Sequence, residues 1–266
     1  MQPTPSSELN TRLAGLIWGE AKTGKTTWAM TLPGRKLLVN FDPDGYTSVA
    51  HRDDFSLLDL SQLPDSEQVN QAKKVGTFIQ QSEDQYDSVI VDSLTSFATA
   101  ALRDAVNRGV GKTPKFTPSL DAPGLVAYGA RTTSMISVID GILRATSQRK
   151  QHCFFITHDE DPEYDDDGKH IVRQTMMLPA KSRKAASIKV SEIYYISRNS
   201  RGERIVYLSP FGVITPMGSR IFDTKAVPKF TLAYDAMQDD DGQNDTLDAI
   251  FASWEKNGRR KLTTAP

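Results

Sequence analysis

Short apolar runs alternate along the chain with longer segments in which apolar residues recur every three or four positions. The runs at 13–18, 36–41, 88–91 and 152–157 are apolar almost throughout and end in glycine or polar residues. Such runs are typical of buried parallel strands. Helical spacing is found at 26–32, 66–81 and 125–143. Strands that alternate with helices predict an α/β domain whose mostly parallel sheet is flanked by helices.

The pattern changes after residue 157. Residues 159–167 hold seven acids in nine positions. Two β-like runs follow at 188–196 and 203–208, with the turn residues Asn199 and Gly202 between them. This arrangement predicts a C-terminal antiparallel hairpin that closes one edge of the sheet.

Composition excludes several classes of protein. Lys and Arg number 32 and Asp and Glu 33, which excludes a globally basic DNA-coating protein but leaves room for a local basic patch. The single cysteine, Cys153, can build neither a disulfide framework nor a cysteine-based zinc site. No apolar run approaches the roughly 18 residues of a membrane span, and the N-terminus does not resemble a signal peptide. We therefore expect a cytoplasmic protein without a membrane partner.

Residues 19–26 match the pattern G-x-x-x-x-G-K-[ST], directly after a predicted strand and at the start of a predicted helix. Glycines let the backbone wrap closely around phosphate, and the helix N-terminus adds partial positive charge. We expect Lys25 to reach the β- and γ-phosphates of ATP and the Thr26 hydroxyl to bind Mg²⁺. The alternative is an ordinary strand–helix turn that contains glycine. The predicted nucleotide-binding residues are Gly19, Glu20, Ala21, Lys22, Thr23, Gly24, Lys25, Thr26 and Thr27.

Acidic residues follow two of the predicted strands. Asp92 would emerge at the carboxyl edge of the sheet, where it could orient Mg²⁺ together with Thr26, or it could cap the next helix. Asp42 and Asp44 follow the second strand, and an acid there could orient the attacking water. We favour Asp44 for that role, although D-P-D-G is also a turn signal.

His158 ends the fourth predicted strand. A polar side chain at that point would face the γ-phosphate from the side of the sheet. We expect His158 to sense the γ-phosphate, and the alternative is a purely structural histidine.

These motifs together resemble the RecA-like recombinase ATPases. Residues 88–94 are similar to the family's second nucleotide motif, in which a serine follows the Mg²⁺-orienting aspartate. Residues 41–44 resemble the motif on its second strand, whose last acid, usually Glu, activates water; Asp44 has a shorter reach. His158 stands where RecA carries a glutamine sensor.

A closer resemblance, over about residues 11–215, is to small phage-encoded P-loop ATPases related to the single-strand-annealing recombinases. Ala127-Tyr128-Gly129 and the strand end Phe155-Ile156-Thr157-His158 carry it. The resemblance implies Mg²⁺-dependent ATP hydrolysis with Lys25, Asp44 and His158 as catalytic residues. It also implies single-stranded DNA as partner and a homo-oligomer with ATP near the subunit interface.

Three alternatives to this function stay open at the level of the sequence. A RecA-like motor or loader for DNA replication or packaging would use the same P-loop. A small-molecule kinase is disfavoured, because no Arg-rich lid segment is evident. In a nucleotide-binding protein with weak or no hydrolysis, Asp44 would be only a turn residue.

Two segments are candidates for contact with DNA. Residues 181–189 contain four cations and no acid, and we expect a loop there. Lys181, Arg183 and Lys184 would contact single-stranded DNA or reach a phosphate across a subunit interface, unless they only balance the preceding acids in solvent. The weaker candidate is the loop 109–124, where Lys112 and Lys115 flank Phe116, an aromatic ring on which a base could stack.

We expect three parts in the chain. Residues 1–10 form a flexible N-terminus, residues 11–235 the RecA-like ATPase domain, and residues 236–266 an acidic and polar tail with a short helix near 247–254. The last ten residues are expected to be disordered.

Overall fold

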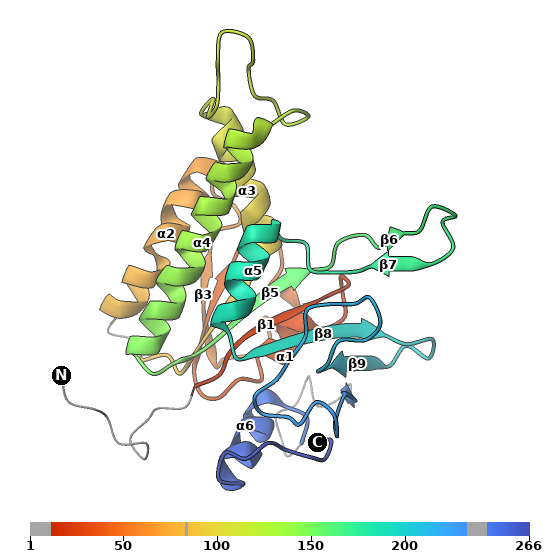
Figure 1. Ribbon diagram of the computed structural model, residues 1–266. Coiled ribbons are helices and arrows are strands. Elements are labelled where there is room, and N and C mark those ends of the chain that lie inside the picture. The colour runs from red at the N-terminus through yellow and green to blue at the C-terminus, as the bar shows by residue number, and fades with distance from the viewer. Residues whose placement is uncertain (1–11, 83–84, 233–243) are drawn as a thin grey trace, which may run out of the picture.

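An eight-stranded sheet runs through the centre of the computed structural model, which describes residues 12–82, 85–232 and 244–266 (Figure 1). The strand order is β10-β9-β8-β1-β5-β4-β2-β3. Neighbours from β8 to β3 pair in parallel, whereas β9 pairs antiparallel with both β8 and β10. The expected fold class is therefore confirmed: a mostly parallel α/β sheet with antiparallel strands at its C-terminal end.

The elements of the main sheet and its helices have the following bounds. The strands are β1 (Ala14–Gly19), β2 (Lys36–Asn40), β3 (Phe55–Asp59), β4 (Ser88–Asp92), β5 (His152–His158), β8 (Glu192–Arg198), β9 (Arg204–Tyr207) and β10 (Lys229–Leu232). A separate two-stranded ribbon pairs β6 (Glu163–Tyr164) with β7 (Ile171–Arg173). The helices are α1 (Lys25–Ala29), α2 (Asp65–Gln81), α3 (Leu94–Asn107), α4 (Gly124–Gln148), α5 (Ala180–Lys189) and α6 (Leu247–Lys256), with a 3₁₀ turn, η2, at Thr47–Val49.

Alternate residues of each central strand face opposite layers, because successive side chains of a strand point to opposite sides of the sheet. On β1, Leu16 and Trp18 pack with the inward faces of α2, α3, α4 and α5. Ile17 faces the other way and packs with α1, α6 and the antiparallel strands. Both layers are buried, which explains why the central strands read as unbroken apolar runs.

The sequence pattern did not predict several of the observed elements. β3 lies at the sheet edge and is only partly buried, so its sequence lacks a continuous apolar run. The ribbon β6–β7 lies within and just after the acid-rich segment and projects from the body of the molecule (Figure 1). The strand β10 was likewise not predicted, whereas the helix expected after Asp92 is present as α3.

The hairpin of β8 and β9 confirms the predicted antiparallel pair, but its first strand begins later than expected. Ile188 and Lys189 belong to α5, and β8 starts only at Glu192. The expectation of a loop at residues 181–189 was therefore wrong. Alanines and long straight-chain residues in that segment have good helix propensity, which explains the difference.

The C-terminal segment packs onto the layer that contains α1. Trp28 Nε1 donates to the carbonyl oxygen of Asp245 at 2.9 Å, and the apolar side of α6 belongs to the second core cluster. The predicted short helix is thus present. Within the last ten residues, Leu262 pairs with Phe222 and its N donates to the Ile221 carbonyl at 2.8 Å, so the expectation of disorder does not hold at this residue. The domain boundaries stay a prediction; residues 1–10 and the acidic stretch up to residue 243 lie outside the described residues.

None of the helices in the described part of the chain is both long and apolar enough to cross a lipid bilayer.

Candidate nucleotide site and a neighbouring cationic cavity

The loop between β1 and α1 adopts backbone conformations that only certain residues tolerate. Gly19 has φ 143°, and a Cβ atom there would stand 2.0 Å from the carbonyl oxygen of Ile196 on β8. Gly24 precedes α1 with φ 87°, in the left-handed region. Glycine is therefore required at both ends of the loop. The N-terminus of α1 points its backbone N–H groups into the space that the loop encloses.

Lys25 lies buried inside this loop. Its Nζ donates to the Gly19 carbonyl at 2.9 Å and to that of Glu20. Burial lowers the pKa of Lys25 to about 8, although the nearby carboxylates of Asp92, Asp159, Asp42 and Glu20 oppose the shift. A buried ammonium held inside this loop is suited to the β- and γ-phosphates of a nucleotide.

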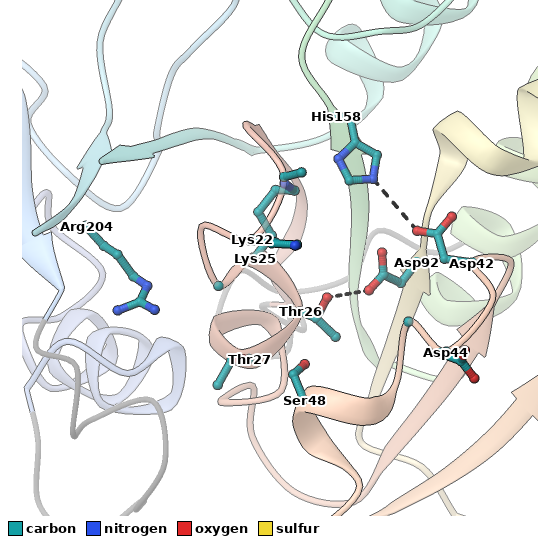
Figure 2. Close-up of a pocket in the computed structure, with 13 residues that line it drawn as sticks. Lys22, Lys25, Thr26, Thr27, Asp42, Asp44, Ser48, Asp92, His158 and Arg204 are labelled. Carbon is teal, nitrogen blue, oxygen red and sulfur yellow. Dashed lines mark hydrogen bonds and ion pairs between the residues drawn. The ribbon is translucent and has the colours of Figure 1, made fainter. Parts of the chain in front are cut away.

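Thr26 and Asp92 meet at the carboxyl end of β4. The Thr26 hydroxyl donates to Asp92 Oδ2 (Figure 2). Burial raises the pKa of Asp92 to about 6, and the charge of Asp42 adds to this, while the Thr26 hydrogen bond and the charges of Lys25 and His158 act in the opposite direction. The helix cap is Ser93, whose side chain accepts from Ser96 N at 3.2 Å, so Asp92 is not needed for that role. A hydroxyl and a carboxylate oxygen are ligands that suit Mg²⁺.

Asp42 is tied to the start of α3 and to β5. Its Oδ1 accepts from Ser93 Oγ at 3.3 Å and from Ser96 Oγ, and its Oδ2 lies 3.8 Å from His158 Nε2. Burial acts to raise the pKa of Asp42, but the contacts with His158, Ser96 and Ser93 outweigh it and hold the pKa below its ordinary value. The carboxylate of Asp42 therefore stays ionised beside Asp92.

Asp44 is placed differently from Asp42. It lines the same cavity, but its carboxylate points away from Asp92 and His158 in Figure 2. Its φ of 55° is left-handed, a conformation that Asp tolerates better than most residues. The predicted D-P-D-G turn is closed by Gly45 N, which donates to the Asp42 carbonyl at 3.0 Å, and the Asp44 carbonyl accepts from Thr47 N in the next turn, also at 3.0 Å. The role of Asp44 in hydrolysis stays a prediction.

These groups surround a cavity of about 600 Å³. Its lining consists of Ala21, Lys22, Gly24, Lys25, Thr26, Thr27, Asp42, Asp44, Gly45, Ser48, Asp92, His158 and Arg204. Gly19, Glu20 and Thr23 shape the loop without lining the cavity. Ser48 and Arg204 were not predicted. Ser48 belongs to a 3₁₀ turn with no sequence signature, and Arg204 comes from a strand 181 positions beyond Thr23.

Thr95 connects this site to a second cavity. Its Oγ1 lies 2.9 Å from Thr157 Oγ1 and accepts from the backbone N of His158 at 3.0 Å. The second cavity measures about 410 Å³ and has three arginines and one glutamate in its wall. It is lined by Thr95, Ala98, Thr99, Arg131, Glu160, Arg173, Met177, Leu178, Pro179, Ala180 and Arg183. Thr95 and His158 thus form a short partition between the two cavities.

The predicted basic cluster is divided between two environments. Arg183 turns inward, with a side chain only 15% exposed; it pairs with Glu160 at 3.5 Å and donates to the Met176 carbonyl at 3.1 Å. Lys181 and Lys184 are exposed on α5. The structure therefore does not present the three residues as one solvent-facing patch.

A P-loop that begins a helix, a strand-end aspartate bonded to its threonine and a mostly parallel sheet are the features of a P-loop ATPase domain. Comparison with family models agrees: the model described as "AAA domain" matches residues 11–214, and the chain belongs to this family. No curated protein matches the chain. Among solved structures, the crystal structure of the RadB recombinase is similar over 75% of this chain and 84% of that chain, with 12% identity and a TM-score of 0.41.

Proposed function

We propose that this protein is a Mg²⁺-dependent ATPase that acts on single-stranded DNA, in phage-type recombination or strand annealing, as a cytoplasmic homo-oligomer. Magnesium and ATP suit the groups at the P-loop. Lys25 would bind the β- and γ-phosphates, and Thr26 and Asp92 would hold the metal, which supplies charge neutralisation on the phosphates when bound. Asp44 or Asp42 would orient water, and His158 would contact the γ-phosphate end.

One observation supports coupling between ATP turnover and the binding of a polyanion. The cavity next to the nucleotide site is cationic and shares a wall with that site. Arg131, Arg173 and Arg183 line that cavity; Arg183 pairs with Glu160 at 3.5 Å and Arg173 with Glu163 at 2.6 Å, which leaves Arg131 as the arginine of the lining with no acid partner in the described part of the chain. Arginine forks suit phosphate groups. Since Thr95 holds the backbone of His158, a phosphodiester bound in the second cavity would act on a residue that faces the γ-phosphate end of the first.

Arg131 supports this reading most directly. Its Nε is buried and has no hydrogen-bond partner in the described part of the chain, and its guanidinium lies 4.9 Å from the ring centre of Tyr128. Burial holds the pKa of Arg131 below its ordinary value, against the influence of Tyr128. A buried donor without a partner is costly, and an anionic ligand would satisfy it.

A second candidate function, as a motor or loader that acts on a protein, is favoured by the acid-rich segment after β5. Of the seven acids at 159–167, Glu160 lines the cationic cavity and Glu163 pairs with its Arg173, so this segment would oppose the approach of a DNA backbone. The partner in that case would be a basic protein.

ATP turnover measured alone, with single-stranded DNA and with duplex of the same sequence tests the first candidate. We expect single-stranded DNA to stimulate turnover and Arg131→Gln to weaken DNA affinity by roughly tenfold. Arg144→Gln, an exposed arginine on the same helix, is the matched control. Stimulation by a basic protein and not by DNA would favour the loader, and absence of any turnover would contradict both.

The exposed lysines of α5 permit a separate test of DNA contact. Replacing Lys181 and Lys184 by Ala should flatten the salt dependence of DNA affinity by about 0.7 in the log–log slope for each phosphate that these lysines neutralise in the wild-type complex. An unchanged slope with weakened self-association would instead place these lysines at a subunit interface.

A further inference from the structure

The hairpin of β8 and β9 carries two arginines directly opposite each other. Arg198 pairs with Arg204 in the register of the two strands, so both side chains leave the same face of the sheet. Ile196 and Val206, the next pair on that face, pack in the core cluster that contains α1. Both arginines are thereby held beside the phosphate loop. Like charges in directly opposite positions destabilise a sheet, so this pair requires compensation.

Both arginines donate hydrogen bonds to the phosphate loop itself. Arg198 Nη2 donates to the Lys22 carbonyl at 2.6 Å, and Arg204 Nε donates to the Thr23 carbonyl at 3.1 Å. These two hydrogen bonds hold both guanidinium groups against the backbone of the phosphate loop. A polyphosphate bound in the loop would bring full negative charge close to both.

The two arginines differ in their relation to the nucleotide cavity. Arg204 is half-buried and lines the cavity wall, whereas Arg198 is exposed and is not part of the lining. Figure 2 shows Arg204 across the phosphate loop from Asp92, Asp42 and His158, on the side where Thr27 lies. The acids mark the γ-phosphate end, because Mg²⁺ and the attacking water belong there. Arg204 therefore stands toward the opposite end of a bound nucleotide.

We propose that Arg204 is a nucleotide-binding residue that contacts the α-phosphate end of a nucleoside di- or triphosphate, and that Arg198 acts only by holding the loop. The proposal rests on the proposed function in that ATP is the ligand of this cavity. A contact at the α-phosphate end is made equally to ATP and to ADP and does not change as the γ-phosphate is transferred. It therefore contributes uniform binding, which affects KM and leaves kcat unchanged.

The test measures the dissociation constants of ATP and ADP, together with KM and kcat, for wild type and four variants. Arg204→Gln removes the charge, and Arg204→Lys keeps it without the fork. Arg198→Gln removes only the loop contact. Arg201→Gln at the exposed tip of the hairpin is the control. Thermal melting of each variant checks that it folds.

We expect Arg204→Gln to weaken ATP and ADP binding by the same factor, roughly tenfold, and to raise KM with kcat retained. Arg204→Lys should recover part of the loss. Arg198→Gln should cost roughly twofold, and Arg201→Gln nothing measurable.

Three results would overturn the proposal: unchanged affinity in Arg204→Gln, a loss confined to ATP, or equal losses in Arg204→Gln and Arg198→Gln. A loss confined to ATP would place the Arg204 guanidinium at the γ-phosphate. Equal losses in the two variants would mean that Arg204 only supports the loop. If wild type binds neither nucleotide, the proposed function has failed rather than the assignment of Arg204. If Arg204→Gln fails to fold, Arg204→Lys decides, since it must then show the equal loss for both nucleotides.

Discussion

The two cavities on either side of the Thr95–His158 partition are built in opposite ways. The nucleotide cavity takes most of its lining from the contiguous phosphate loop, from the turn just after β2 and from the last residues of β4 and β5. The cationic cavity collects side chains from α3, α4, β7 and α5 and from the segments between β5 and α5. The first is a local motif completed by the common edge of parallel strands, and the second exists only after distant helices have packed.

The two cavities also differ in the charged residues that line them. The wall of the first cavity contains the acids Asp42, Asp44 and Asp92, which suit a metal site, and Lys25 is buried close to Asp92 and Asp42. In the second cavity arginines predominate. A metal-bound nucleotide suits the first set and a bare phosphate backbone suits the second. Substitution of one residue at a time can test this contrast between the two cavities.

The largest effect is expected at Lys25. Lys25→Ala should lower ATP turnover by about 10³-fold or more and strongly weaken ATP binding, because it removes the buried charge on the β- and γ-phosphates. Turnover and equilibrium binding are the measurements, with Lys73→Ala on the exposed side of α2 as the control. Turnover like that of wild type would contradict the assignment of the nucleotide cavity.

The next largest effects on turnover are expected at the two acids after β2, Asp44 and Asp42. Asp44→Asn should leave ATP affinity nearly unchanged and lower kcat by about 10²-fold, as for the loss of a water-orienting base. Asp42→Asn should also impair turnover, since Asp42 contacts Ser93, Ser96 and His158. Single-turnover rates at saturating ATP compare the two. Normal turnover in Asp44→Asn combined with loss in Asp42→Asn would assign the water to Asp42, the acid beside Asp92.

Thr95 tests whether the cavities communicate. Thr95→Val removes the hydroxyl that accepts from His158 N and contacts Thr157. Removing a hydrogen bond of about 1 kcal/mol should reduce the stimulation of turnover by single-stranded DNA roughly fivefold, with a smaller fall in the basal rate. Thr99→Val, which alters the wall of the second cavity without touching His158, is the control. Equal stimulation in wild type and Thr95→Val would mean that the cavities act independently.

The last effect is expected on stability, away from both cavities. His152 begins β5, accepts from Leu13 N at 3.1 Å and lies edge-on against Phe251. Burial lowers the pKa of His152 to about 4; Asp87 and Glu255 oppose this shift and Arg12 adds to it. The folded pKa lies below the unfolded value of about 6.5, so the unfolded state takes up the proton first as pH falls.

Stability should therefore be fully retained above pH 6.5 and decline between about pH 6.5 and 4, by about 1–2 kcal/mol at pH 5. Denaturant unfolding at about pH 7.5 and 5 measures the decline. His152→Asn, which keeps an acceptor for Leu13 N, should flatten it, and His51→Asn on the surface should not. An unaltered pH slope in His152→Asn would assign the decline to other groups.

The sequence by itself determined the phosphate loop, the parallel core strands and the positions of Asp42, Asp44, Asp92 and His158 at strand ends. These features depend on a few consecutive residues and on the rule that parallel strands end at the same edge. It also indicated the β8–β9 hairpin through its turn residues. Exposed or short elements such as β3 were missed, because partial burial leaves no unbroken apolar run to detect.

Only the tertiary structure decided which acid lies beside Asp92, that Arg183 turns inward to Glu160, and that Arg204 reaches the phosphate loop. Each of these depends on contacts between segments remote in sequence, as between Thr23 and Arg204. The SRNSRGER stretch places Arg198 and Arg204 on either side of a turn, but nothing in it indicates that β8 pairs with β1 and so brings them to the loop. Periodicity reports the local environment of a residue, whereas a site built across elements depends on which strands become neighbours.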